Sequence, residues 1–334
     1  MDSLTQVRLT RELVDIDSTT GREAEAGAWL AVTLRRLGYD VVEQLVRDGR
    51  FNVIATAGRP DLVFSTHFDC VPPFFPSREE RGLVFGRGSC DAKGILAAQL
   101  AAAERLRAAG ERRMALLFVA GEERGSDGAR VANAQAPPGI RYLVNGEPTD
   151  NRLGSATRGM LRVRLRAKGR AAHSAFPELG ESAIDKLLDA LMVIRGLQLP
   201  EDPLLGRTHY TVGLIEGGVA PNVVSPRASA ELLFRTVGEA APVRAALAVV
   251  DGLVSVEHVL DIPAVRMHTV PGFETEVFPY TTDVPVLRNW GTPLLVGPGS
   301  IHVAHTDEEH VVIDELRAAV GLYETLAGRL LGRV

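Results

Sequence analysis

The segment DLVFSTHFDC, residues 61–70, joins an apolar run directly to a histidine and an aspartate. Two further runs, RMALLFVA at 113–120 and RYLVN at 141–145, are also nearly continuous in Val, Leu and Phe. Parallel strands that are buried on both faces have this composition, whereas half-exposed strands alternate apolar and polar residues. We therefore predict an α/β fold with a central, mostly parallel mixed sheet.

Segments before and between these runs have the apolar spacing of helices, and we predict that these helices flank the sheet. Residues 22–37 and 92–109 have this spacing, and each segment ends at a glycine suited to the C′ position. After residue 268 we predict a helix near 282–289, a strand at 292–297 and a closing helix over about 311–331.

A different pattern occupies the middle of the chain. MLRVRLRAKG at 160–169 alternates as a half-exposed strand, and the segments after it predict helix, strand, strand, helix and strand. This β-α-β-β-α-β order is ferredoxin-like. A chain of 334 residues also exceeds what one core usually serves. We predict a small domain at 158–268, inserted into a larger domain formed by 1–157 and 269–334.

Bulk properties exclude several classes of protein. The net charge is −5 and the basic residues are scattered, which argues against a nucleic-acid-binding protein. The charged segment 1–17 does not resemble a signal peptide, and no window reaches the roughly 18 apolar residues of a membrane span. We expect a cytoplasmic protein without a membrane partner. The two cysteines, Cys70 and Cys90, are expected to be small semi-buried fillers, with a liganding role as the alternative.

Histidines and acidic residues follow the predicted strands of the larger domain. Ligands gather at the carboxyl ends of strands in open α/β sheets, so we expect these side chains to lie close together. In this number they suit two divalent cations and leave one carboxylate free to act as a base. The candidates are His67, Asp69, Asp91, Glu122, Glu123, Glu147 and His305.

Each motif also has an ordinary interpretation when it is taken alone. His67 suits a surface loop, Asp91 suits the N-cap of the following helix, and the pair Glu122-Glu123 suits a charged turn. Adjacent side chains diverge, so the two glutamates would have different roles. The spacing alone does not choose among three histidines of the last loop, which are His302, His305 and His310.

The predicted insertion contains further candidates. His173 follows an alternating strand, where a histidine is commonly a loop residue. Arg158 and Arg235 suit a substrate carboxylate, with surface ion pairing as the alternative. A dinucleotide loop at 86–91 is excluded, because GRGSCD lacks the third glycine and the acidic residue about 20 positions later.

Together the segments HFD, DAKG, GEE, GEP and GPGSIHVAH resemble the M20 family of metallopeptidases and amidohydrolases, which includes acetylornithine deacetylase. The resemblance implies a larger domain like that of zinc exopeptidases. It also implies a cis peptide at Asp91-Ala92. It assigns the roles of metal ligand to His67, Glu123, Glu147 and His305, bridging ligand to Asp91, general base to Glu122 and orienting carboxylate to Asp69.

The resemblance further implies two divalent ions, with Zn²⁺ expected and Co²⁺ or Mn²⁺ as alternatives. The inserted domain would form a homodimer and act as a lid. His173 would reach the partner's active site to stabilise the oxyanion, while Asn222, Arg235 and Arg158 would bind polar groups of the substrate.

We expect an enzyme that removes the acyl group from an N-acyl amino acid, in the manner of acetylornithine deacetylase. The alternative is a di- or exopeptidase of carboxypeptidase type acting on short peptides. A non-catalytic binding protein on the same fold is the more remote alternative.

Overall fold

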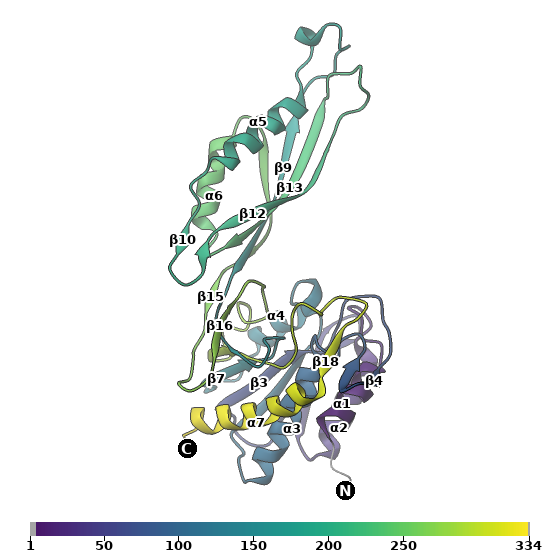
Figure 1. Ribbon diagram of the computed structural model, residues 1–334, viewed down its shortest axis with the longest axis vertical. Helices are drawn as coiled ribbons and strands as arrows, with labels where there is room; N and C mark the ends of the chain where they lie inside the picture. Colours follow the sequence, from purple (N-terminus) through teal and green to yellow (C-terminus); the bar gives the residue numbers. More distant parts are fainter. Residues whose placement is uncertain (1–4, 333–334) are drawn as a thin grey trace. The chain divides into compact units, whose positions relative to one another are not determined.

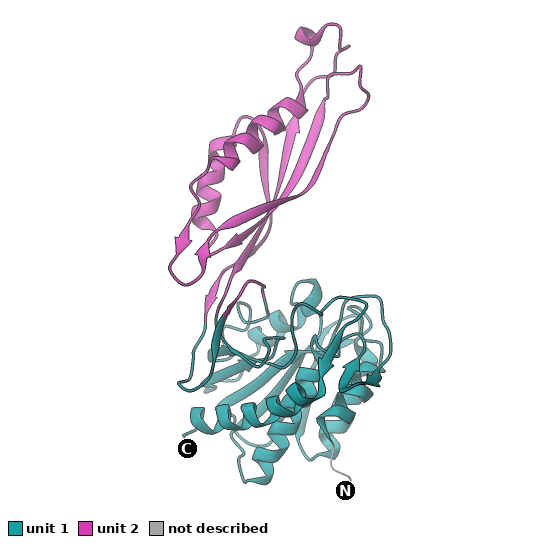
Figure 2. Cartoon of the chain, viewed as in Figure 1, with its two compact units in different colours: residues 1–155, 267–276, 282–334 teal, residues 156–266, 277–281 magenta. Residues whose placement is uncertain are grey.

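The computed structural model of the protein describes residues 5–332. The chain forms two compact units, shown in different colours in Figure 2. Unit 1 comprises Met1–Ser155, Met267–Glu276 and Thr282–Val334, and unit 2 comprises Ala156–Arg266 and Val277–Thr281. Residues 1–4 and 333–334, at the ends of the predicted larger domain, lie outside the described residues.

A six-stranded sheet forms the centre of unit 1 (Figure 1). β3 is parallel to both of its neighbours, β6 and β7, and β17 is parallel to β7. β1 and β2 add an antiparallel edge. This arrangement confirms the predicted mostly parallel mixed sheet. Its spatial order is β1 (Asp40–Arg47), β2 (Arg50–Thr56), β6 (Met114–Val119), β3 (Leu62–His67), β7 (Tyr142–Asn145) and β17 (Thr292–Leu295).

Both faces of the central strands β3 and β6 are buried, which explains their continuous apolar runs. Leu62 and Phe64 of β3 point into a core that they share with four helices, α1 (Gln6–Val14), α2 (Ala24–Arg36), α3 (Lys93–Ala108) and α7 (Ile313–Leu330). Val63, between them, points into a second core with α4 and Trp290. Successive side chains of a strand face opposite sides, so the consecutive apolar residues 62–64 fill both cores.

The three longest helices of unit 1 occur where the spacing of apolar residues predicts them. The segments 22–37, 92–109 and 311–331 form α2 (Ala24–Arg36), α3 (Lys93–Ala108) and α7 (Ile313–Leu330). No helix within residues 5–332 is long and apolar enough to cross a membrane. The shorter elements of unit 1 are α1 (Gln6–Val14), β4 (Arg78–Glu80), β5 (Leu83–Phe85), η1 (Glu122–Arg124), α4 (Asp127–Ala134) and β18 (His310–Val312).

The prediction of a helix near 282–289 is wrong. These residues form turns, in which the backbone N–H groups of Val286 and Leu287 both donate to the carbonyl oxygen of Asp283. This single turn does not continue as a helix, since the N–H of Trp290 donates to the carbonyl of Leu287, three residues back, and Gly291 follows with a φ of 93°. The segment packs instead through Leu287 and Trp290 against one face of the sheet.

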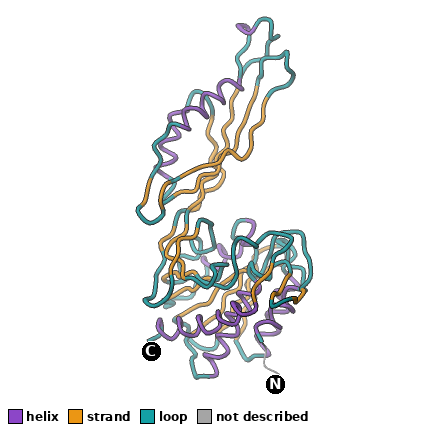
Figure 3. The backbone as a smooth tube through the Cα atoms, viewed as in Figure 1, coloured by secondary structure: helices purple, strands orange, loops and turns teal. Residues whose placement is uncertain are grey.

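Unit 2 has the predicted β-α-β-β-α-β order, and its four-stranded antiparallel sheet has the ferredoxin-like strand order β12-β13-β9-β14. Figure 3 shows its helices on one face of the sheet. The main elements are β9 (Gly159–Lys168), α5 (Ala183–Arg195), β12 (His209–Gly217), β13 (Arg227–Thr236), α6 (Ala241–Leu247) and β14 (Ser255–Ile262).

Short elements complete the described chain. They are η2 (Pro177–Leu179), β10 (Glu201–Asp202), β11 (Gly206–Arg207) and η3 (Ala248–Val250) in unit 2, together with the three-stranded sheet of β15 (Val265–Arg266), β8 (Leu153–Thr157) and β16 (Thr275–Phe278).

Phe64→Ala should destabilise unit 1 strongly, because Phe64 is fully buried and packs edge-to-face on Tyr323 with ring centroids 5.3 Å apart. We expect a loss of about 3–5 kcal/mol in the free energy of unfolding. Urea unfolding followed by tryptophan fluorescence measures this loss, since both tryptophans, Trp29 and Trp290, lie in unit 1. The control is Val42→Ala at a side chain that is 59% exposed, and equal losses for the two variants would contradict the assignment of the core.

Candidate metal centre

Most of the predicted site residues of unit 1 lie beyond the carboxyl ends of the parallel strands. His67 is the last residue of β3, Glu122 and Glu123 follow β6, and Glu147 follows β7. His305 lies in the long loop after β17. Because these strands run in one direction, their carboxyl ends meet at one edge of the sheet. The topology therefore brings together side chains that are far apart in the sequence.

Two groups of potential ligands share Asp91. The first contains His67, Asp91 and Glu147, the second contains Asp91, Glu123 and His305, and the donor atoms of each group lie within 4.8 Å of one another. Asp91 Oδ1 lies 3.0 Å from His67 Nε2, and Asp91 Oδ2 lies 3.3 Å from His305 Nε2. Each carboxylate oxygen of Asp91 thus faces a different imidazole.

The loop that carries Asp91 does not use its side chain as a helix cap. Ala92 holds the N-cap position of α3, which has no side-chain cap hydrogen bond. The Asp91 carboxylate turns instead toward the two imidazoles. The Asp91-Ala92 peptide bond is cis, as the family resemblance implies. The N-cap interpretation of Asp91 is therefore wrong.

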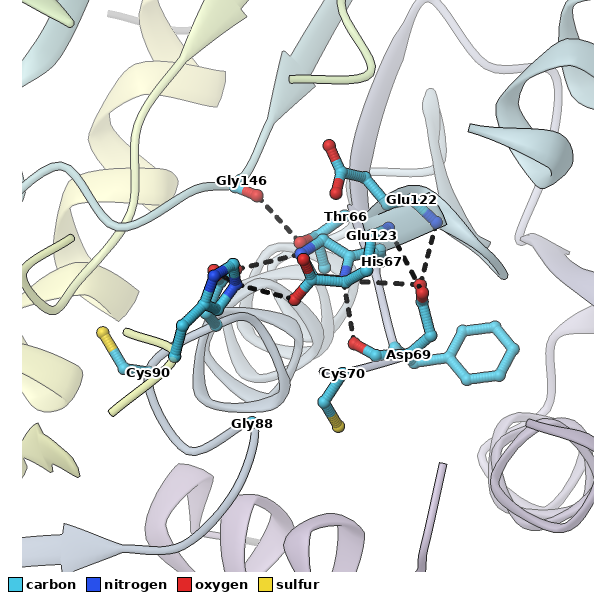
Figure 4. Close-up of polar contacts among 12 residues, drawn as sticks. Thr66, His67, Asp69, Cys70, Gly88, Cys90, Glu122, Glu123 and Gly146 are labelled. Carbon is cyan, nitrogen blue, oxygen red and sulfur yellow. Dashed lines mark hydrogen bonds and ion pairs between the residues drawn. The ribbon is translucent and has the colours of Figure 1, made fainter. Parts of the chain in front are cut away.

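Asp69 acts mainly on the backbone of the loop that carries the two glutamates (Figure 4). Its Oδ1 accepts the N–H of Glu122 at 3.0 Å, and its Oδ2 accepts the N–H of Glu123 at 3.3 Å and the hydroxyl of Thr20 at 2.8 Å. His67 Nδ1 lies 2.9 Å from the carbonyl oxygen of Asp69 and 3.5 Å from its carboxylate. One residue thus orients the imidazole and fixes the glutamate loop.

The structure distinguishes among the three histidines of the last loop. His305 Nε2 lies 2.9 Å from Glu123 Oε1, and the backbone of His305 has a φ of 64°. His310 lies in β18, and its ring is 5.2 Å from that of Phe85. His302 is exposed and belongs to neither ligand group. A left-handed conformation at a histidine is uncommon, and such positions cluster at functional sites.

The imidazoles lie in a strongly negative environment. Hydrogen bonds to Asp91 and Glu123 raise the pKa of His305 to about 10. Burial lowers the pKa of His67, but the Asp69 and Asp91 carboxylates outweigh it and hold the value well above the usual one. Burial opposes ionisation of Asp91, yet both imidazoles hold the pKa of Asp91 below its ordinary range. Positive charge is therefore strongly favoured at this edge of the sheet.

The pKa values of three other carboxylates, those of Glu122, Glu147 and Asp283, are raised, whereas that of Asp91 is lowered. Burial raises the pKa of Glu122 well above its ordinary value, and the neighbouring Asp283 and Glu147 carboxylates add to this effect. Burial likewise raises the pKa of Glu147 and brings that of Asp283 to about 6. Asp283 lies outside the predicted set of site residues, because an aspartate before Val284-Pro285 is the only signal that the sequence gives for it.

The donor set fits divalent cations. Two imidazoles and two further carboxylates surround the shared Asp91, and such nitrogen and oxygen ligands suit Zn²⁺ and similar ions. Glu147 Oε1 is buried and has no hydrogen-bond partner among residues 5–332. A buried carboxylate oxygen without a donor is costly unless a cation or a proton compensates it. The residues present therefore match a pair of metal ions.

The two cysteines lie beside this centre but contribute to neither ligand group. Both are buried, and each fills space next to a glycine. A Cβ at Gly88 would lie 3.0 Å from Cys70 Sγ, and one at Gly299 would lie 2.6 Å from Cys90 Sγ. Tight packing of this kind is ordinary for buried thiols.

The other predicted residues belong to unit 2. Asn222 and His173 lie on two exposed loops joined by a hydrogen bond from the N–H of Ser174 to the carbonyl of Asn222. Arg158 donates to the carbonyl of Arg207. Arg158 Nη1 also lies 3.0 Å from His209 Nδ1, and Arg235 Nη1 is buried with no hydrogen-bond acceptor in the described part of the chain. The surface ion-pair interpretation of these two arginines is not what the structure contains.

Solved structures with this fold are known. A tripeptidase from Staphylococcus aureus matches with a TM-score of 0.81 at 20% identity, covering 96% of each chain. An M20 family metallo-carboxypeptidase from Sulfolobus solfataricus matches with a TM-score of 0.74 at 19% identity, covering 97% of this chain and 98% of its own. A Bacillus subtilis protein described as a dinuclear metal-binding peptidase from the M20 family gives 0.75 at 15%, covering 98% of each. At these identities the likeness establishes the fold.

Sequence relatives are much closer. A protein of Aspergillus clavatus named "Probable carboxypeptidase" is 36% identical over 97% of this chain and 82% of its own length. A protein of the same name from Emericella nidulans is 37% identical over 100% of this chain and 91% of its own. The profile described as Peptidase family M20/M25/M40 matches residues 63–329. The chain belongs to peptidase family M20/M25/M40.

Proposed function

We propose that this protein is a two-metal carboxypeptidase that releases the C-terminal amino acid of short peptides. The observation that carries the proposal is the pair of ligand groups that share Asp91, with the Glu122 carboxylate in the same acidic cluster. Relatives at 36–37% identity that bear the name carboxypeptidase support a peptide substrate. Like other members of its family, the chain is a hydrolase of peptide or amide C–N bonds.

His67, Glu147 and Asp91 would hold one cation, and Glu123, His305 and Asp91 would hold the other. The Bacillus subtilis neighbour is described as dinuclear, which supports a pair of ions here. We expect Zn²⁺, with Co²⁺ or Mn²⁺ as substitutes, because such ligand sets accept several divalent metals. When bound, the two ions lower the pKa of a water molecule and polarise the scissile carbonyl group.

Glu122 supplies the proton transfers. Its carboxylate accepts a proton from the attacking water, whose oxygen forms a bond to the carbonyl carbon of the substrate. Glu122 then gives this proton to the leaving nitrogen as the C–N bond breaks, so that an amine and a carboxylate are released. Asp69 holds the Glu122 N–H and thereby fixes the base.

Arg158 and Arg235 are the groups that we assign to the substrate carboxylate. Burial, and after it the positive charge of Arg158, lowers the pKa of Arg235, and Arg235 Nη1 is buried without a hydrogen-bond acceptor among residues 5–332. A free α-carboxylate would supply an anionic acceptor with the two-point geometry that guanidinium favours. A carboxypeptidase substrate ends in such a group.

The second candidate is the deacylation of an N-acyl amino acid, which the resemblance to acetylornithine deacetylase favoured. Such a substrate also carries an α-carboxylate, and the same atoms would hydrolyse its amide bond. The names of the relatives favour the peptidase over this deacylase. A non-catalytic role is disfavoured, because every ligand and Glu122 are present.

We also propose that two copies associate through unit 2. β12 is an edge strand of its sheet and is exposed along nearly its whole length. Leu214 and Ile215 on it are 59% and 57% exposed. An exposed apolar edge strand is a template for pairing with another strand, and a second copy offers the same edge. His173 of one copy would then stabilise the oxyanion in the site of the other copy, with Asn222 beside it.

The proposed reaction is tested by assaying peptides and N-acyl amino acids side by side, with and without added metal. Protein stripped with a chelator should hydrolyse nothing, and addition of Zn²⁺, Co²⁺ or Mn²⁺ should restore release of the C-terminal residue from di- and tripeptides. Peptides with an amidated C-terminus should be poor substrates, because they lack the anion for the two arginines. N-Acetylornithine and other N-acyl amino acids are assayed in parallel. Faster cleavage of these than of peptides would favour the deacylase, and no cleavage of either class would end the proposal.

Glu122 and Glu123 should separate catalysis from metal binding. Glu122→Gln should lower kcat by about 100- to 10,000-fold and keep both ions, since it removes the proton acceptor alone. Glu123→Gln should lose one ion per chain, since it removes a ligand. Metal content by mass spectrometry and initial rates are the measurements. Loss of metal from Glu122→Gln with none from Glu123→Gln would reverse the assignment.

His173→Ala should lower turnover by about 100-fold or more, the effect of removing one oxyanion donor, with metal content unchanged. In a dimer whose sites are completed in trans, mixing His173→Ala with Glu122→Gln should regain part of the activity. A mixed dimer has one site with an intact base and a partner's intact histidine. Sedimentation velocity of the same samples measures the dimer. Full activity of His173→Ala would remove this residue from the site.

A further inference from the structure

Glu309 is a fully buried carboxylate in the same loop as His305, yet it belongs to neither ligand group. We propose that Glu309, with its partner Arg87, is a positioning residue that sets the place of Asp91 and thereby the metal affinity of both sites. The inference rests on the proposed function, because it assigns to Asp91 the role of shared ligand.

One oxygen of Glu309 holds most of the turn that leads to Asp91. Glu309 Oε1 accepts the backbone N–H groups of Gly88 at 3.0 Å, Cys90 at 3.2 Å and Asp91 at 3.1 Å. The N–H of Gly86 donates to the backbone carbonyl of Glu309 at 3.1 Å. Four N–H groups of a six-residue segment therefore converge on one residue that is more than 200 positions away in the sequence.

The second oxygen of Glu309 is paired with a buried cation. Glu309 Oε2 accepts a hydrogen bond from Arg87 Nη1 at 2.6 Å, and Arg87 is 1% exposed. Arg87 Nε also donates to the carbonyl of Pro73, and its guanidinium lies over the ring of Phe75. A buried charge is tolerated when it is paired and hydrogen-bonded, and both groups here meet that condition.

The position of Asp91 follows from these contacts. With its N–H fixed on Glu309, the Asp91 side chain directs one oxygen to His67 and the other to His305. His305 lies four residues before Glu309, so the same carboxylate links the loop of the second imidazole to the loop of the shared ligand. A displacement of Asp91 would be felt by both ions.

A purely structural role would give a different result. If Glu309 only joined two segments of unit 1, its loss would lower stability and leave metal binding by the folded protein unchanged. Glu111 provides a matched control for that case. It is 5% exposed, accepts the N–H groups of Arg112 and Arg113, and pairs with the Arg113 guanidinium. It precedes β6, whereas the site follows the other end of that strand.

The test is a titration of metal-free full-length protein with Zn²⁺ against a chromophoric chelator, and with Co²⁺ followed by its visible absorption. Glu309→Gln should lower the affinity by about 10- to 100-fold, the usual effect of losing a group that holds a ligand, and should change the Co²⁺ spectrum. Glu111→Gln should leave the metal affinity and the Co²⁺ spectrum unchanged, even if it lowers the thermal unfolding temperature as much as Glu309→Gln does.

Wild-type affinity and spectrum in folded Glu309→Gln would overturn the inference. If that variant does not fold, Glu309→Asp replaces it, because a shorter carboxylate cannot reach all three N–H groups and Arg87 together. Lower affinity then supports the inference, and unchanged affinity overturns it. The wild type separates the two proposals. A wild type that does not bind two ions contradicts the proposed function, whereas two ions with unaffected variants contradict only the role of Glu309.

Discussion

The structure of unit 1 depends on one electrostatic constraint, the burial of several carboxylates around a shared aspartate. Asp91, Glu122, Glu123 and Glu147 lie among two imidazoles, and this excess of negative charge is unfavourable in a buried site without cations. This excess of negative charge raises the pKa values of the two imidazoles and adds to the effect of burial in raising those of Glu122 and Glu147. Divalent ions remove this cost, so the ligand geometry and the proposed chemistry have the same physical origin.

Much of the fold could be predicted from the sequence, because the relevant signals are local. The apolar runs of β3 and β6 are continuous since both faces of the sheet are buried, and β9 alternates since only one face of its sheet is covered by helices. Periodicity carries this information within a few residues. The segment 282–289 forms turns instead of the predicted helix, because the packing of Leu287 and Trp290 against the sheet decides its conformation.

The sequence predicts those residues of the candidate site that directly follow an apolar strand. His67, Glu122 and Glu147 have that signal, whereas choosing His305 over His302 and His310 required the family pattern. The partners of Asp69 and Glu309 could not be predicted, because their acceptor oxygens bind backbone N–H groups, which every residue except proline has. Residue type therefore says nothing about which N–H a buried carboxylate will find. Such contacts depend on the three-dimensional path of the chain alone.

Asp69 and Glu309 have the same structural role on two different loops, since each holds the backbone of a loop that carries candidate metal ligands. Metal ligands that follow strands lie on loops, which are intrinsically more mobile than the sheet beneath them. Asp69 fixes the loop of Glu122 and Glu123, and Glu309 fixes the turn before Asp91, in each case by accepting several N–H groups at once. A carboxylate suits this task better than a neutral acceptor, because charge-assisted hydrogen bonds are stronger and several donors can share one anion. The negative charge of the candidate ligands is thus accompanied by further buried negative charge that holds the backbone of the ligand loops, and the Arg87 guanidinium compensates part of it at Glu309.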